Sequence, residues 1–294
     1  MPQATIPHII ASMRLGAPVF TDTRDPEIFV LEHVRKGYRA AYCPDWINAD
    51  TDGALCGCFK KALEKNDIVL AEVGIWRNVM SRNPDEAKAA FEHSVRRLAT
   101  AEELGACCAV NIVGSWNEQY WDGPHEAHYK QDFFDAAVEA ARRVIDDVKP
   151  KRTKMGFEIL PCQFIDCAEE YMRFIRAIDR EAAGIHYDPA NSISSPRLLY
   201  NNAEFFKNEF KIFGSAVCSI HLKDLRLNPK EFTVNMQEAV IGKGQIDYIN
   251  LLRLIDALPP DTPGMLEHLS TESLYDEAAS SVRTLAKKAG IAFC

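Results

Sequence analysis

Four polar residues, each at the end of a short apolar run, form the most chemically informative combination in this sequence. They are Glu158 in KMGFEIL, Asp188 in GIHYDPA, His221 in VCSIHLKD and Glu267 in GMLEHL. Three carboxylates and one imidazole are suitable ligands for a divalent metal ion. The four residues therefore predict a metal site, provided that the fold brings their segments together.

The elements that carry these residues are short apolar runs that alternate with longer amphipathic stretches. Expected strands cover residues 16–20, 39–43, 67–74, 106–114, 154–160, 183–188, 216–222 and 264–269. Eight strands alternating with helices predict parallel β/α units, and eight strands can close into a (β/α)8 TIM barrel. An open doubly wound sheet is the alternative, because periodicity alone does not show closure. In a barrel, the polar residues at the carboxyl ends of the strands face one common mouth.

The clearest helix is expected over residues 83–105. Asn83 is suited to the N-cap, Pro84 to the first helical position and Gly105 to the position beyond the end. Similar amphipathic patterns predict helices over residues 133–148, 167–179 and 246–258. Without a linker, a low-complexity run or a further repeat, we expect one α/β domain over residues 1–294.

Composition excludes several classes of protein. Hydrophobic content of 47% and charged content of 26% are typical of a soluble globular chain. The net charge of −8 argues against nucleic-acid binding, which needs clustered lysine and arginine. No apolar stretch reaches the ~18 residues of a membrane span, and the N-terminus lacks the pattern of a signal peptide. The nine cysteines form no C-x-x-C pair, so we expect free thiols in a reducing cytoplasm.

A family resemblance adds to this interpretation. The segments FEI, HYDPAN, IHLKD, IGKGQIDYINLLRLIDAL and MLEHL follow one another between about residues 150 and 270. Together they resemble the xylose isomerase-like TIM barrels, a superfamily of sugar isomerases and epimerases, inosose dehydratase and type IV apurinic endonucleases. H-x-K-D followed by G-x-G-x-I-D is the most specific part, whereas the N-terminal half matches more weakly. The resemblance implies a homo-oligomer, a dimer or tetramer, with metal ligands at Glu158, Asp188, His221 and Glu267.

The same residues predict a reaction. Oxygen ligands with one imidazole suit Mn²⁺ as the first expectation, with Mg²⁺ and Co²⁺ as alternatives, and such an ion polarises a carbonyl group. Glu158 and Glu267 end the fifth and eighth expected strands, on opposite sides of the barrel mouth, so each could exchange a proton with a bound substrate. We expect isomerisation or epimerisation of a sugar or polyol by proton transfer next to a carbonyl. The alternative is a lyase that expels water or an aglycone from a keto-sugar.

Two other functions are disfavoured. An endonuclease of this superfamily needs a histidine-rich cluster of several zinc ions and a basic face, whereas only His221 is placed at the site. A sugar-binding protein without catalysis would keep the barrel but would not need both Glu158 and Glu267.

Further residues are candidates for substrate binding. Trp46, Trp76 and Trp116 follow the second, third and fourth expected strands, where flat apolar rings suit the C–H faces of a carbohydrate. Asn191 stands where the epimerases that the chain resembles carry a histidine, a departure that bears on the epimerase assignment. The remaining candidates are His186, which lies two residues before Asp188, and two loop residues, Arg226 and His125.

Overall fold

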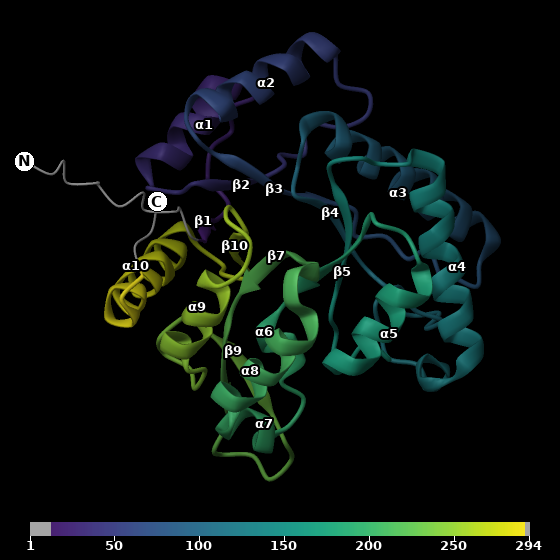
Figure 1. The fold of residues 1–294 in the computed structure, drawn as a ribbon, viewed down its shortest axis with the longest axis vertical. Coiled ribbons are helices and arrows are strands. Elements are labelled where there is room, and N and C mark those ends of the chain that lie inside the picture. Colours follow the sequence, from purple (N-terminus) through teal and green to yellow (C-terminus); the bar gives the residue numbers. More distant parts are fainter. Residues whose placement is uncertain (1–12, 292–294) are drawn as a thin grey trace, which may run out of the picture.

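Eight parallel strands close into a barrel in the computed structural model, which describes residues 13–291. The strand order is β1, β2, β3, β4, β5, β6, β7 and β10, and β10 pairs with β1 to complete the circle (Figure 1). The predicted barrel is confirmed, and the open sheet is excluded. The barrel strands are β1 (Arg14–Gly16), β2 (Ala40–Tyr42), β3 (Val69–Gly74), β4 (Cys108–Ile112), β5 (Lys154–Glu158), β6 (Ala183–Tyr187), β7 (Val217–Leu222) and β10 (Pro263–Leu266).

The expected strands overlap these strands, and the first is displaced along the chain. We expected it over residues 16–20, whereas β1 ends at Gly16. Pro18 has no backbone N–H and cannot continue a ladder between two neighbours. The strand instead begins earlier, at Arg14, which pairs with Pro263 of β10.

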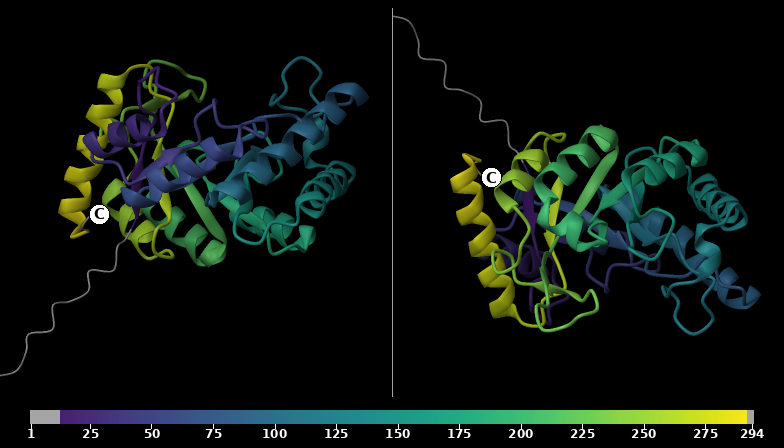
Figure 2. Two further views of the ribbon diagram at one scale, coloured as in Figure 1. Left: turned by 90° about the horizontal axis from the view of Figure 1, so that it is seen from above. Right: turned by 90° about the horizontal axis from the view of Figure 1, so that it is seen from below.

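Helices surround the barrel (Figure 2). The predicted helix over residues 83–105 is confirmed: Asn83 accepts hydrogen bonds from Asp85 N and Glu86 N, and Gly105 ends the helix with a left-handed φ of 74°. No helix within the described residues is long and apolar enough to cross a membrane. The helices are α1 (Pro26–Arg35), α2 (Gly53–Lys65), α3 (Pro84–Leu104), α4 (Gln131–Val148), α5 (Ala168–Ile178), α6 (Pro189–Ser192), α7 (Pro196–Tyr200), α8 (Asn202–Phe213), α9 (Tyr248–Asp256) and α10 (Glu272–Ala289), with short 3-10 turns η1 (Glu126–Tyr129) and η2 (Gly214–Ala216).

Aromatic packing fixes the strand that carries Glu158. Phe157 of β5 points outward and meets Phe174 of α5 edge to face at 5.0 Å between ring centroids. Phe174 in turn contacts Phe134 of α4 at 6.2 Å and Phe164 at 5.3 Å. These separations lie in the favourable range for aromatic pairs, and each large ring buries much apolar surface. The outward face of β5 is therefore anchored, while its end faces the barrel mouth.

An antiparallel hairpin interrupts the β/α alternation directly after β7. It consists of β8 (Asp224–Leu227) and β9 (Met236–Ala239). Asp224 fastens the base of this hairpin to the following loop, because its carboxylate accepts hydrogen bonds from Gly242 N, Gly244 N and Ile246 N at 2.9–3.1 Å. This explains why H-x-K-D and G-x-G-x-I-D occur together in the sequence.

Gly244 allows the loop to approach Asp224 so closely. A Cβ atom at this position would lie 2.1 Å from Asp224 Oδ1 and 2.5 Å from the carbonyl oxygen of Leu225. We predict that Gly244→Ala lowers the free energy of unfolding by about 1–3 kcal/mol, as is typical of overpacking, when measured by urea denaturation.

Gly57→Ala is the matched control for this substitution. A Cβ at Gly57, inside α2, would meet nothing within 4 Å, and alanine is the better helix former by roughly 1 kcal/mol. The control should be at least as stable as the original chain. Equal stability of the two alanine variants would contradict the close-approach explanation.

Candidate metal centre

The ends of four barrel strands bring Glu158, Asp188, His221 and Glu267 together. One possible ligand atom from each lies within 4.8 Å of the others. His221 Nδ1 is 3.1 Å from Glu158 Oε1 and 3.0 Å from Glu267 Oε2. Asp188 and His221 are fully buried, and Glu158 is 4% exposed. The structure thus joins into one cluster the four residues that the sequence singled out.

Hydrogen bonds orient two of the carboxylates, those of Asp188 and Glu158. Asp188 is the N-cap of α6, and its Oδ1 accepts hydrogen bonds from Ala190 N and Asn191 N. These two bonds orient the carboxylate and leave Oδ2 directed at the cluster. The side-chain amide of Asn191 donates to Glu158 Oε1 at 3.1 Å. Asn191, predicted to bind substrate, therefore lies in the site as a hydrogen-bond partner of a candidate ligand.

Lys223 is a site residue that the sequence analysis did not select. Its side chain is 3% exposed, and its Nζ lies 2.6 Å from Asp188 Oδ2 and 2.8 Å from Glu267 Oε2. Side chains two residues apart on a strand point the same way, so the spacing from His221 was an available signal. Lys223 Nζ is also 3.7 Å from Glu238 Oε1 of β9, so the hairpin reaches the edge of the site.

The surroundings shift the pKa values of Glu158, Glu267 and His221 in different directions. Burial, opposed by the neighbouring His221, raises the pKa of Glu158 to about 7. Burial also acts on Glu267, but His221 and Lys223 outweigh it and hold the pKa of that carboxyl below its ordinary value. Burial lowers the pKa of His221, but the surrounding carboxylates outweigh burial and raise it well above its ordinary value. Metal binding at this imidazole would therefore release a proton.

The donor set fits one divalent ion. Asp188 Oδ2 and Glu267 Oε2 are buried without a well-oriented hydrogen bond among the described residues, although Lys223 pairs with both at short distance. Three carboxylates carry three negative charges, and Lys223 with a divalent ion would balance them if His221 is neutral. Three oxygen donors with one imidazole are ligands that Mn²⁺, Mg²⁺ and Co²⁺ accept.

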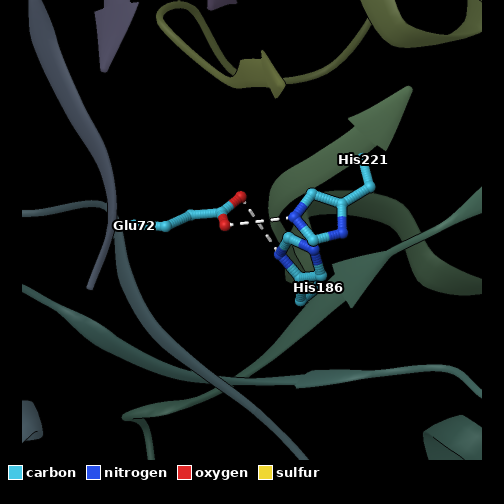
Figure 3. A group of neighbouring side chains, drawn as sticks. All are labelled: Glu72, His186 and His221. Atoms are coloured by element: carbon cyan, nitrogen blue, oxygen red, sulfur yellow. Dashed lines mark hydrogen bonds and ion pairs between the residues drawn. The ribbon is translucent and has the colours of Figure 1, made fainter. Parts of the chain in front are cut away.

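A second layer of polar side chains lies beneath His221. Figure 3 shows Glu72 of β3 pointing towards His221 of β7 and His186 of β6. His186 is fully buried, and its ring centroid lies 4.1 Å from that of His221. His186, predicted to bind substrate, thus lies inside the barrel among other buried polar groups, beside Glu72 and His221.

Of the three tryptophans predicted to line the pocket, only Trp76 contacts a candidate ligand. Its ring is stacked with His221 at 6.3 Å between centroids and 27° between planes. Trp76 has a φ of 47°, a left-handed conformation that is strained for an aromatic residue and is often found at functional sites.

The structure places the rings of Trp46 and Trp116 against outer helices. Trp46 meets Phe29 of α1 and Phe59 of α2 edge to face, at 5.9 and 5.7 Å. Trp116 packs in the same way on Phe133 of α4, at 5.0 Å. Both rings turn to the outer helices because aromatic partners are available there.

The two remaining candidates, His125 and Arg226, lie outside the cluster. His125 Nδ1 accepts a hydrogen bond from Ala127 N and so caps the turn η1. Its neighbour in the H-x-x-H spacing, His128, is fully buried and bonds Ser115 Oγ. Arg226 is exposed on β8, opposite Gln237. Among the described residues, neither His125 nor Arg226 contacts a candidate ligand, so their predicted contact with substrate is not supported.

The fold and the site together define the class of protein. Residues 37–287 match the family model of the xylose isomerase-like TIM barrels. Because this match spans most of the chain, the protein belongs to that family. No curated protein sequence matches the chain.

Solved structures share the fold at low sequence identity. D-psicose 3-epimerase from Clostridium cellulolyticum H10 superposes with a TM-score of 0.68 and 14% identity, over 95% of this chain and 100% of the other. A xylose isomerase-like TIM barrel protein from Mycobacterium smegmatis, in complex with magnesium, gives 0.65 and 14%, over 94% and 96%. The probable 3-DHS dehydratase from Bacillus anthracis gives 0.67 and 11%, over 93% and 98%. At these identities the likeness concerns the fold.

Lys223 should stabilise the metal-free protein. Removing its charge takes the amine away from Asp188 and leaves Glu267 with His221 but without Lys223, and breaking a buried pair costs about 3–5 kcal/mol. We predict a loss of this size in the unfolding free energy of metal-free Lys223→Met protein, measured by urea denaturation. The control Lys243→Met breaks an exposed pair with Glu277 and should change stability by at most about 1 kcal/mol. Equally small losses in both variants would rule out this role.

Proposed function

We propose that the protein is a divalent-metal-dependent enzyme that moves a proton at the carbon next to a carbonyl in a sugar or polyol. The observation that carries this proposal is the cluster of three carboxylates and one imidazole at the barrel mouth, with Trp76 beside it. The first candidate reaction is isomerisation or epimerisation. A D-psicose 3-epimerase shares the fold of this chain, which supports this choice.

A lyase is the second candidate. Proton removal next to the carbonyl is common to both reactions, and the lyase then expels a group such as water from the neighbouring carbon. The observation that favours it is the hydrogen bond from Asn191 to Glu158 Oε1, at a position where the family resemblance implies a histidine in the epimerases. A probable dehydratase with the same fold supports keeping this candidate.

Glu158, Asp188, His221 and Glu267 would hold the ion, for which we propose Mn²⁺ first, with Mg²⁺ or Co²⁺ as alternatives. A bound ion would polarise the carbonyl and so acidify the C–H of the adjacent carbon that carries the hydroxyl. Lys223 balances the charge that remains, and Trp76 offers an apolar face to the C–H side of a sugar.

The two glutamates are proposed to exchange protons with the substrate. Glu158 ends β5 and Glu267 follows β10, and these strands are separated by β6 and β7 in the barrel. A substrate between them would present one face to each carboxyl group. One glutamate would remove a proton from carbon, and the other would return one, either to the opposite face or to the neighbouring oxygen.

The metal site is tested by removing ligands. We predict that Asp188→Ala and His221→Ala proteins keep the fold, as judged by circular dichroism, but bind Mn²⁺ at least about 100-fold more weakly, because even an outer partner of a ligand is worth 10–100-fold. Bound metal is measured by elemental analysis after equilibrium dialysis. Arg226→Ala, an exposed change on β8, is the control and should bind as the original chain does. Undiminished metal in both ligand variants would refute the assignment.

The catalytic roles are tested by Glu158→Gln and Glu267→Gln. Glutamine keeps the size and one coordinating oxygen but removes the base, so kcat should fall by about 10²–10⁴-fold while metal is retained. The assay incubates candidate ketoses and oxidised sugars with Mn²⁺ in D₂O. Deuterium on a carbonyl-adjacent carbon indicates an isomerase, and an unsaturated product indicates a lyase. If both variants react at the original rate, the glutamates act as ligands only.

A further inference from the structure

We propose that Glu72 is a positioning residue for the metal centre: it holds the imidazole of His221 so that Nδ1 is directed to the ion. This inference rests on the metal site proposed above. Glu72 lies within β3 and His221 on β7, and these strands are not neighbours in the barrel. The bond between Glu72 Oε2 and His221 Nε2, at 3.2 Å, therefore crosses the barrel interior (Figure 3).

The two nitrogens of His221 have separate partners. Nε2 faces Glu72, whereas Nδ1 faces Glu158 and Glu267 at 3.1 and 3.0 Å. A carboxylate only accepts hydrogen bonds, so Glu72 favours a hydrogen on Nε2, and when a metal ion displaces the proton of His221 it is the proton on Nδ1 that leaves. In the neutral imidazole this leaves the lone pair of Nδ1 for a metal ion. Partners of this kind set both the tautomer and the ring orientation of metal-ligating histidines.

The carboxylate of Glu72 is itself held in place. Ser219 Oγ donates to Oε1 at 2.5 Å, and His186 Nδ1 lies 3.5 Å from the same oxygen. Glu72 is 1% exposed, and both partners are fully buried. Ser219 and His221 stand two residues apart on β7, so the strand presents the anchor and the ligand on one face. The Glu72 carboxylate is therefore held in place well enough to orient the imidazole of His221.

Packing alone does not explain a glutamate at this position. Removing a carboxylate from water costs several kcal/mol, and apolar side chains of similar volume would fill the barrel interior at least as well. Glu72, His186 and His221 also lie close enough together to hold an ion of their own. His221 belongs to both groups, however, and ions on both nitrogens would require a fully deprotonated imidazole. We therefore assign Glu72 to the single centre above it.

The test compares Co²⁺ binding by the full-length original chain with Glu72→Gln and Glu72→Asp. The amide of glutamine can donate to His221 Nε2 and so favour the tautomer with hydrogen on Nδ1, and aspartate keeps the charge but is one methylene shorter. We expect both variants to bind Co²⁺ about 10–100-fold more weakly, by competition with a chelating dye, and to change its visible absorption spectrum. The spectrum reports ligand geometry, which a general loss of stability would not change.

Asn111→Ala is the matched control, since Asn111 is a fully buried polar residue of the neighbouring strand β4 that bonds the backbone of Arg77. It should leave the affinity and spectrum of bound Co²⁺ unchanged. The proposal would be overturned if the folded Glu72 variants bound Co²⁺ with the affinity and spectrum of the original chain. It would also be overturned if the original chain bound two ions and the Glu72 substitutions removed one of them. If the original chain bound no divalent ion at all, that result would refute the proposed metal-dependent function itself, and with it this inference.

Discussion

Like charges buried side by side impose the constraint on which the rest of this structure depends. Glu158, Asp188 and Glu267 converge at the barrel mouth with little access to water. Three such carboxylates repel one another and lose hydration, so the surrounding residues must supply positive charge. Lys223 and His221 do this in the protein alone, and the same electrostatic demand makes the cluster a strong attractor for a divalent cation.

Four consecutive residues at the end of β7, His221 to Asp224, supply this positive charge and its support. His221 and Lys223 point into the site, and Asp224 ties the next loop to the barrel. The hairpin that follows brings Glu238 to the rim, where its carboxylate pairs with His268 Nδ1 at 2.9 Å. A short sequence motif therefore supplies a candidate ligand, a charge partner and the anchor of the following loop.

The sequence predicted the barrel and the four converging residues because both depend on local order. Alternating strands and helices imply parallel pairing, and a polar residue that ends an apolar run lies at the barrel mouth. Glu72 lies within a strand, and nothing in its local sequence shows that it reaches across to His221. The direction in which a ring points also depends on residues far away in the sequence. Trp46 and Trp116 follow strands as Trp76 does, but the surrounding aromatic residues decide where each one packs.

Asn191 was placed near the site by the family resemblance, and its bond with Glu158 became visible only in three dimensions. Lys223 could have been selected because it lies two residues after His221 and so points to the same side, but a lysine beside a strand end usually extends to water. Its burial depends on acidic groups from other strands, so only the assembled barrel shows why it turns inward.

The polar layer inside the barrel has a consequence for how this protein would respond to selection. Glu72, Ser219 and His186 occupy positions that barrels of this kind usually fill with branched apolar side chains. Natural proteins often exchange some folding stability for function at such places. A laboratory selection for heat resistance alone should therefore replace this layer early, whereas a selection that also demands turnover should retain it and find its gains in the outer helices.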